Sequence, residues 1–136
     1  MPIAGGENEH TLYGFGQFLR AGAVDIAQPD IGSCGGISAA RHIMALAQSL
    51  GLQVNPHVWG SAIAQAASLH VIAAVPNAHH SLFPQQPVLE YDRSSHPFRQ
   101  KLITAPIALV DGWVHVPDKP GLGVEVDRAV LEQYRS

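Results

Sequence analysis

Four side chains that can titrate or bind a cation recur along the chain at similar intervals. They are Glu7, Asp30, His57 and Glu90, and each stands at or just past the end of a short apolar run. Their separations are close to the roughly 30 residues that one strand and its crossover helix occupy in a (β/α)8 barrel. Two or three carboxylates can hold Mg2+, and a histidine beside an aspartate can be oriented for proton transfer. The residues therefore favour abstraction of a proton from the carbon next to a carboxylate.

Strand-like and helix-like patterns alternate in the part of the chain that carries these residues. Short apolar or β-rich runs occupy 1–4, 23–30, 52–57 and 87–92. Helical patterns occupy 11–22, 37–51 and 61–76. Such alternation is typical of βα units and a parallel sheet, so the fold class is predicted to be α/β. Since the carboxyl ends of parallel strands face one crevice, the four side chains should meet there.

The composition changes after Asp92, so we divide the chain into residues 1–92 and residues 93–136. The second region is rich in proline and turns and lacks a helical period. Within it, Asp111-Gly112 separates two alternating apolar runs, which predicts a β-hairpin because both turn residues tolerate positive φ. Asp127 is placed to cap a short terminal helix.

Composition excludes several classes of partner. The chain has 136 residues and a formal net charge of −3, with no run of Lys or Arg. The sequence therefore has no basic patch that would bind nucleic acid or an anionic membrane surface. Cys34 is the single cysteine and no segment has the pattern of a signal peptide or a spanning helix. We therefore predict a cytoplasmic protein without an internal disulfide.

The segments around the four residues resemble the enolase superfamily, in particular its mandelate racemase/muconate lactonizing enzyme family. The similar segments are the third metal-ligand strand "IAGGEN", the dyad-aspartate strand "QPDIGSCGGIS", the dyad-histidine strand "NPHVWGSAIAQAASLH" and the last strand "VLEYD". "HVWGSAIAQAASLH" and "LEYD...PFR" look more like acid-sugar dehydratases and sugar-lactone cycloisomerases than like mandelate racemase itself. The resemblance covers essentially the whole chain.

This resemblance implies a role for each of the four residues. Glu7 would bind Mg2+, and Asp30 would orient His57. His57 would be the general base or acid, and Glu90 would hydrogen-bond the enolate. The substrate would be a small carboxylate, an acid sugar, that undergoes dehydration, cycloisomerisation or racemisation. The resemblance also implies the family's chemistry, in which a Lys or His base removes the proton and Mg2+ stabilises the ene-diolate.

The family's enzymes have a capping domain and then a barrel, of which this chain resembles the last four strands. We expect the C-terminal half, about four βα units, of a TIM-type (β/α)7β barrel, followed by a hairpin and short helix that would pack on a capping domain. The family's Lys-x-Lys strand and two further metal carboxylates have no counterpart here, and Met1 lies hard against the first strand. We therefore expect a C-terminal fragment that is inactive alone and binds Mg2+ weakly or not at all. Open strand edges predict self-association or pairing with a complementary barrel half.

Two other functions stay open at the sequence level. The chain could be a non-catalytic remnant that serves as an interaction module. Alternatively, the G-x-C-x-G pattern of residues 32–36 could present Cys34 as the nucleophile of a cysteine hydrolase. Pro29 and Asp30 argue against this, since they separate the pattern from its strand.

Structural roles also compete with the functional ones for single residues. Asp30 could cap the helix after Gly36, and His57 could be a packed histidine. Trp59 could wall the pocket or simply pack. His70 and the pair His79-His80 have no spacing that predicts a zinc site.

Overall fold

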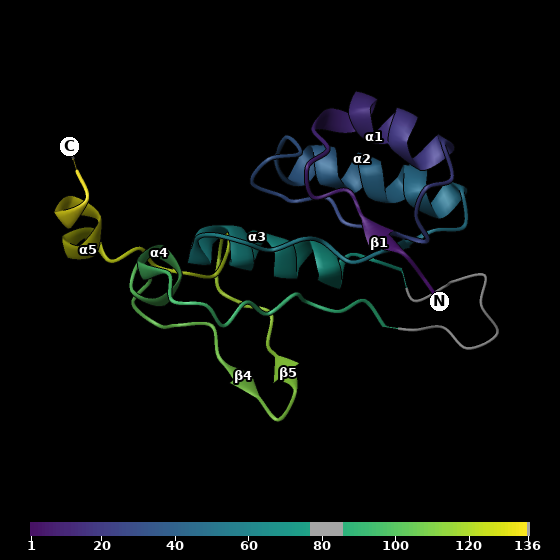
Figure 1. The fold of residues 1–136 in the computed structure, drawn as a ribbon. Helices are drawn as coiled ribbons and strands as arrows, with labels where there is room; N and C mark the ends of the chain where they lie inside the picture. The colour runs from purple at the N-terminus through teal and green to yellow at the C-terminus, as the bar shows by residue number, and fades with distance from the viewer. Residues whose placement is uncertain (77–85, 136) are drawn as a thin grey trace.

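A computed structural model describes residues 1–76 and 86–135 and contains three successive βα units (Figure 1). The parallel strands, in sheet order, are β1 (Ala4–Gly5), β2 (Ile26–Ala27) and β3 (Gln53–Val54). The helices that follow them are α1 (Thr11–Arg20), α2 (Gly36–Ser49) and α3 (Ala62–Ala73). The predicted α/β class is confirmed, and each predicted helix is present.

The register of the sheet aligns the carboxyl ends of its strands. Ile26 lies opposite Ala4 on one side and Gln53 on the other. The ladder continues past β2, where the Gln28 N–H donates to the Gly5 carbonyl at 2.9 Å. The loops that leave the three strands therefore begin at one edge of the sheet, where the candidate residues lie.

The core forms between the sheet and the first two helices, which pack side by side (Figure 1). In α2 the buried residues are Ala40, Ile43, Met44 and Ala47, which is the spacing of one helical face. Phe15 of α1 is fully buried in the same cluster. This apolar face holds α1 and α2 against the sheet.

Helix α3 is buried on more than one side. Ser61 caps it by accepting a hydrogen bond from the Ala64 N–H at 3.3 Å. Its buried residues include the five consecutive positions 65–69, which point to all sides of the helix. The helix contacts α2 on one side and α4 (Pro97–Gln100) on another. It therefore joins the two regions of the chain.

The prediction of a strand over 87–92 is wrong, so the described residues contain three βα units instead of about four. This segment has no ladder partner in the described part of the chain. Pro87 has no N–H to donate, and the Val88 N–H donates to the Asn55 side chain instead of a backbone carbonyl. The segment is therefore held to the residue after β3 by a side chain and not by a backbone ladder.

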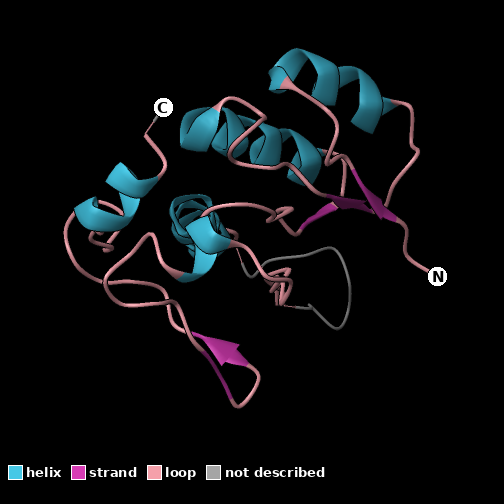
Figure 2. Cartoon of the chain, turned by 60° about the vertical axis from the view of Figure 1, so that its left-hand side comes forward, coloured by secondary structure: helices cyan, strands magenta, loops and turns pink. Residues whose placement is uncertain are grey.

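The region after Asp92 contains the predicted hairpin and terminal helix (Figure 2). The hairpin consists of β4 (Leu109–Val110) and β5 (Trp113–Val114), and Asp111 and Gly112 both have positive φ, at 50° and 82°. Asp127 caps α5 (Arg128–Gln133), as predicted. The short helix α4 was not predicted, because four residues carry no periodicity. Among the described helices, none is long and apolar enough to cross a membrane.

Candidate active site

His57 and Asp30 form a hydrogen-bonded pair at the carboxyl edge of the sheet. His57 Nδ1 lies 2.8 Å from Asp30 Oδ2, although 27 residues separate the two along the chain. Both side chains are largely buried, with 21% of His57 and 14% of Asp30 exposed. Asp30 accepts a hydrogen bond from the Nδ1–H of a neutral ring, so Nε2 is the nitrogen left for proton exchange.

Asp30 also organises the turn after β2. Its Oδ1 accepts a hydrogen bond from the Gly32 N–H at 2.7 Å, and its carbonyl accepts one from the Cys34 N–H at 2.7 Å. It is not the cap of α2, because the N-cap residue is Gly35, which has no side chain to accept from the helix N–H groups. The turn fixes one carboxylate oxygen and leaves the other for His57.

Glu7 contacts the other side of the histidine ring. Its Oε2 lies 3.2 Å from His57 Nε2, and its side chain is 56% exposed. Gly6 delivers it there with a φ of 119°, and a Cβ at this position would lie 2.9 Å from the Phe15 ring. A side chain at residue 6 would therefore displace either the Phe15 ring in the core or the neighbouring Glu7.

Glu90 reaches the same edge through a residue that sequence reasoning missed. The Gln28 Nε2 donates a hydrogen bond to Glu90 Oε1. Gln28 lies two residues before Asp30, so strand alternation was the signal that could have identified it. The structure thus brings Glu7 and Asp30 to the two ring nitrogens of His57. Glu90 is tied to Gln28, two residues before Asp30, and among the described residues it has no hydrogen bond or ion pair with the other three.

The family model described as "Enolase C-terminal domain-like" matches residues 1–130. This chain belongs to that enolase family. D-galactarolactone cycloisomerase of Agrobacterium fabrum is 44% identical over 135 residues, which are 99% of this chain and 36% of that protein. D-galactonate dehydratase of Ralstonia pickettii is 35% identical over 131 residues, or 96% of this chain and 34% of that protein. The resemblance to the enolase superfamily is confirmed.

Solved structures agree with these relatives. The crystal structure of 3,6-anhydro-D-galactonate cycloisomerase from Zobellia galactanivorans has a TM-score of 0.85 and 39% identity, covering 98% of this chain and 36% of that one. A member of the enolase superfamily from Polaromonas sp. JS666 has a TM-score of 0.76 and 39% identity, covering 100% of this chain and 34% of that one. The chain spans about a third of the length of the relatives it matches.

The Mg2+ that enolase-superfamily enzymes generally use does not fit the described residues by themselves. Residues 1–76 and 86–135 contain no group of three or more His, Cys, Asp or Glu side chains placed to hold a metal ion. Glu7 offers one carboxylate, and its Oε2 contacts His57. Mg2+ keeps its waters unless several oxygens replace them, so a single carboxylate is a poor site.

We expect the isolated chain to bind Mg2+ only weakly. Isothermal titration calorimetry of the chain with MgCl2 should show no saturable binding in the micromolar range. Glu7→Gln should leave the titration unchanged, since Glu7 alone does not make a site. Saturable micromolar binding would contradict the prediction, and its loss in Glu7→Gln would assign it to Glu7.

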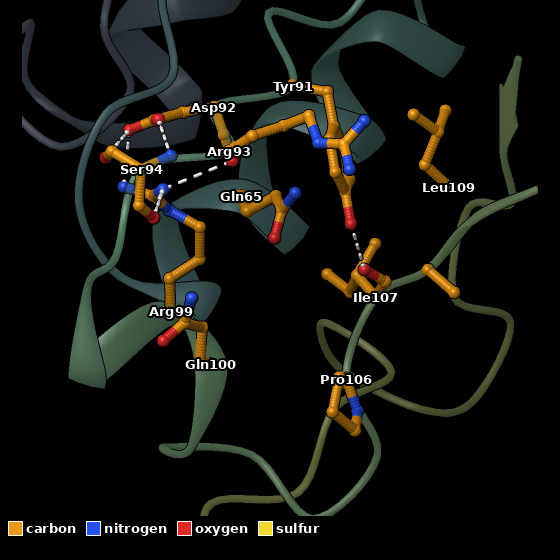
Figure 3. Close-up of a pocket in the computed structure, with 11 residues that line it drawn as sticks. Gln65, Tyr91, Asp92, Arg93, Ser94, Arg99, Gln100, Pro106, Ile107 and Leu109 are labelled. Carbon is orange, nitrogen blue, oxygen red and sulfur yellow. Dashed lines mark hydrogen bonds and ion pairs between the residues drawn. The ribbon is translucent and has the colours of Figure 1, made fainter.

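Arg99 is a second residue that sequence reasoning missed, and it ties the loop after His57 to the segment after Glu90. Figure 3 shows its contacts with Asp92 and Ser94. Its Nε donates to the Gly60 carbonyl, and its Nη1 donates to the carbonyls of Asp92 and Ser94, each at 3.2 Å. Its Nη2 lies 2.6 Å from Asp92 Oδ2. The guanidinium is buried and connects two segments that carry candidate residues.

A cavity of about 400 Å3 lies beside this arginine, between α3 and residues 106–109. Figure 3 shows the residues that line it. The Tyr91 hydroxyl donates to the Ile107 carbonyl at 2.8 Å on its far side. Glu7, Asp30, His57 and Glu90 do not line it. The candidate active site and this cavity are therefore separate.

Cys34 has the properties of a packed thiol. Its side chain is fully buried in the core, and burial together with the negative charge of Asp30 raises the pKa of the thiol. A nucleophilic cysteine needs a lowered pKa and access to substrate. The structure therefore argues against the cysteine hydrolase.

We expect Cys34 to be unreactive in the folded chain. Iodoacetamide at neutral pH should label it slowly, because the thiol is buried and protonated, and labelling should become rapid in urea. Intact-mass spectrometry measures both rates on the same sample. Rapid labelling of the folded chain would restore the cysteine hydrolase as a candidate.

The other histidines considered from the sequence are His70, which the structure describes, and the pair His79-His80. His70 Nε2 lies 3.2 Å from the Leu122 carbonyl, which gives it a packing role between α3 and the C-terminal region. His79 and His80 lie outside the described residues. Trp59 is 65% exposed and packs edge-on against His96, at 6.2 Å between ring centroids.

Proposed function

We propose that this chain supplies the proton-transfer part of an active site that forms an enolate from an acid-sugar carboxylate. His57 moves the proton, Asp30 orients His57, Glu90 hydrogen-bonds the enolate and Glu7 contributes to a metal site. The observation that carries the proposal is the contact of His57 with Asp30 at 2.8 Å and with Glu7 at 3.2 Å. These residues come from three different strand ends.

The geometry supports His57 as the group that exchanges the α-proton. Asp30 accepts a hydrogen bond from Nδ1–H, so the basic nitrogen of a neutral His57 is Nε2, which lies beside Glu7 at 3.2 Å in the chain alone. When Nε2 takes the proton from the substrate carbon, the C–H electron pair passes into the carboxylate and the ring becomes positively charged. Asp30 stabilises that charge at hydrogen-bond distance. The reverse step returns the proton to carbon.

The relatives support a polyhydroxy carboxylate as substrate. Their names are D-galactarolactone cycloisomerase, arabinonate dehydratase and D-galactonate dehydratase. Dehydration, cycloisomerisation and racemisation can all begin with the same proton abstraction. The proposal is therefore for the shared first step.

We further propose that a complementary barrel half completes the site by supplying the other metal carboxylates and the Lys-x-Lys strand. The sheet supports this, because no described strand pairs with the outer edge of β1 or of β3. Unpaired strand edges favour association with another chain or segment. The active form would be an assembly, and the chain alone would be inactive.

A hybrid enzyme tests the proposal. In D-galactarolactone cycloisomerase of Agrobacterium fabrum, this chain would replace the 135-residue segment that matches it. We expect the hybrid to convert D-galactarolactone and to exchange its α-proton in deuterium oxide, both followed by 1H NMR. The isolated chain should do neither.

A folded hybrid without either activity would contradict the proposal and favour the non-catalytic remnant. Circular dichroism and size-exclusion chromatography establish whether the hybrid is folded. The same assays on the parent enzyme set the reference rate.

A further inference from the structure

Gln28 faces the candidate active site. Its N–H donates to the Gly5 carbonyl at 2.9 Å, which fixes the backbone just past β2. The next residue, Pro29, is fully buried. Because side chains alternate along an extended segment, Gln28 and Asp30 lie on the face opposite Pro29.

The side chain of Gln28 bridges two segments that are far apart in sequence. Its amide reaches Glu90, 62 residues later, in a segment that belongs to no strand of the described sheet. The contact therefore joins two segments that no backbone ladder connects in the described part of the chain. The Glu90 segment is fixed nearby, since the Val88 N–H donates to Asn55 Oδ1 at 3.1 Å.

The chemistry of this contact distinguishes the two oxygens of Glu90. The Gln28 Nε2 group only donates, so Glu90 Oε1 accepts. When the carboxyl group carries a proton, placing it on Oε2 leaves Oε1 as the better acceptor for the Gln28 amide. Oε2 is then left to donate a hydrogen bond into the crevice, and a fixed donor stabilises a developing oxyanion better than a mobile one.

We propose that Gln28 is a positioning residue that holds the Glu90 carboxyl and makes Oε2 the oxygen that meets the enolate. This inference rests on the proposed function, because it assigns Glu90 its partner within the same site. Gln28 acts through Glu90 and touches no reacting atom.

The contact itself is tested in the full chain by 15N-1H NMR of the side-chain amides. Glu90→Met should shift the Gln28 amide resonances, while the matched change Glu125→Met, at an exposed glutamate, should leave them in place. Unshifted Gln28 resonances in Glu90→Met would overturn the inference without affecting the proposed function.

The positioning role is tested by kinetics in the hybrid enzyme. Gln28→Leu should lower kcat by about 10- to 100-fold with little change in KM. In a Glu90→Met background the same change should have no further effect, because the group it positions is gone. Gln17→Leu, at an exposed residue of α1, should match the parent hybrid.

Two results would overturn the positioning role. One is a Gln28→Leu hybrid with an unchanged kcat. The other is an equal loss with and without Glu90, which is what a merely structural role produces. By contrast, a hybrid that is equally active with and without His57 would contradict the proposed function itself.

Discussion

His57→Asn in the hybrid enzyme should slow exchange of the substrate α-proton by about a thousandfold. Asparagine can still donate a hydrogen bond to Asp30, so the turn after β2 keeps its partner. It has no basic nitrogen at the position of Nε2, which lies 3.2 Å from Glu7 in the chain. The loss should therefore be in proton transfer. The measurement is the rate of deuterium incorporation, together with kcat for D-galactarolactone.

His42→Asn is the matched control for this variant. His42 is exposed on α2 and belongs to no part of the proposed site. Its replacement should leave both rates within twofold of the parent hybrid. A His57→Asn hybrid that exchanges the α-proton at the parent rate would remove His57 from its proposed role, and with it the mechanism.

The α/β architecture was predictable because local patterns agree with the tertiary structure. In α2, the apolar spacing that predicts the helix is the spacing that the core buries. The hairpin was predictable from Asp111-Gly112, because few residue pairs adopt positive φ twice in succession. Each of these predictions depends on neighbours within a few residues.

The fourth strand was not predictable in the same way. Residues 87–92 carry apolar residues typical of a strand, but a strand also needs a backbone partner. The Val88 N–H finds the side chain of Asn55, 33 residues earlier, and Pro87 donates nothing. Such a contact depends on residues far away in the sequence, so a local pattern cannot predict it.

The candidate site was predictable to the extent that topology alone places its residues. Glu7, Asp30 and His57 follow successive parallel strands, and parallel strands bring their carboxyl ends together. Gln28 and Arg99 act through contacts over 62 and 39 residues, which spacing does not reveal. Gln28 shares a strand face with Asp30 and was within reach of the same argument. Arg99 was not, since it lies on a four-residue helix.

Arg99→Met should destabilise the chain by on the order of 3 kcal/mol, because it removes a buried charge that three carbonyls and a carboxylate surround. The side chain of Arg99 is 8% exposed, so water does not replace these partners easily. Methionine fills similar space but donates no hydrogen bond. The carbonyl of Gly60, in the loop after His57, then loses its partner. Urea denaturation followed by circular dichroism measures the change in unfolding free energy.

The pH dependence of the unfolding free energy should show how much of the Arg99→Met effect comes from the ion pair with Asp92. Hydrogen bonds from the Ser94 N–H and hydroxyl, followed by the charge of Arg99, lower the pKa of Asp92. A lowered folded-state pKa contributes stability above the unfolded pKa of about 3.9, and that stability is lost as the pH falls further. The difference in unfolding free energy between wild type and Arg99→Met should therefore become smaller in acid.

Arg135→Met is the matched control for Arg99→Met. Arg135 pairs with Glu132, but its side chain is 77% exposed, and such pairs contribute about 1 kcal/mol or less. An Arg99→Met chain as stable as Arg135→Met would show that the arginine does not hold the two site segments together.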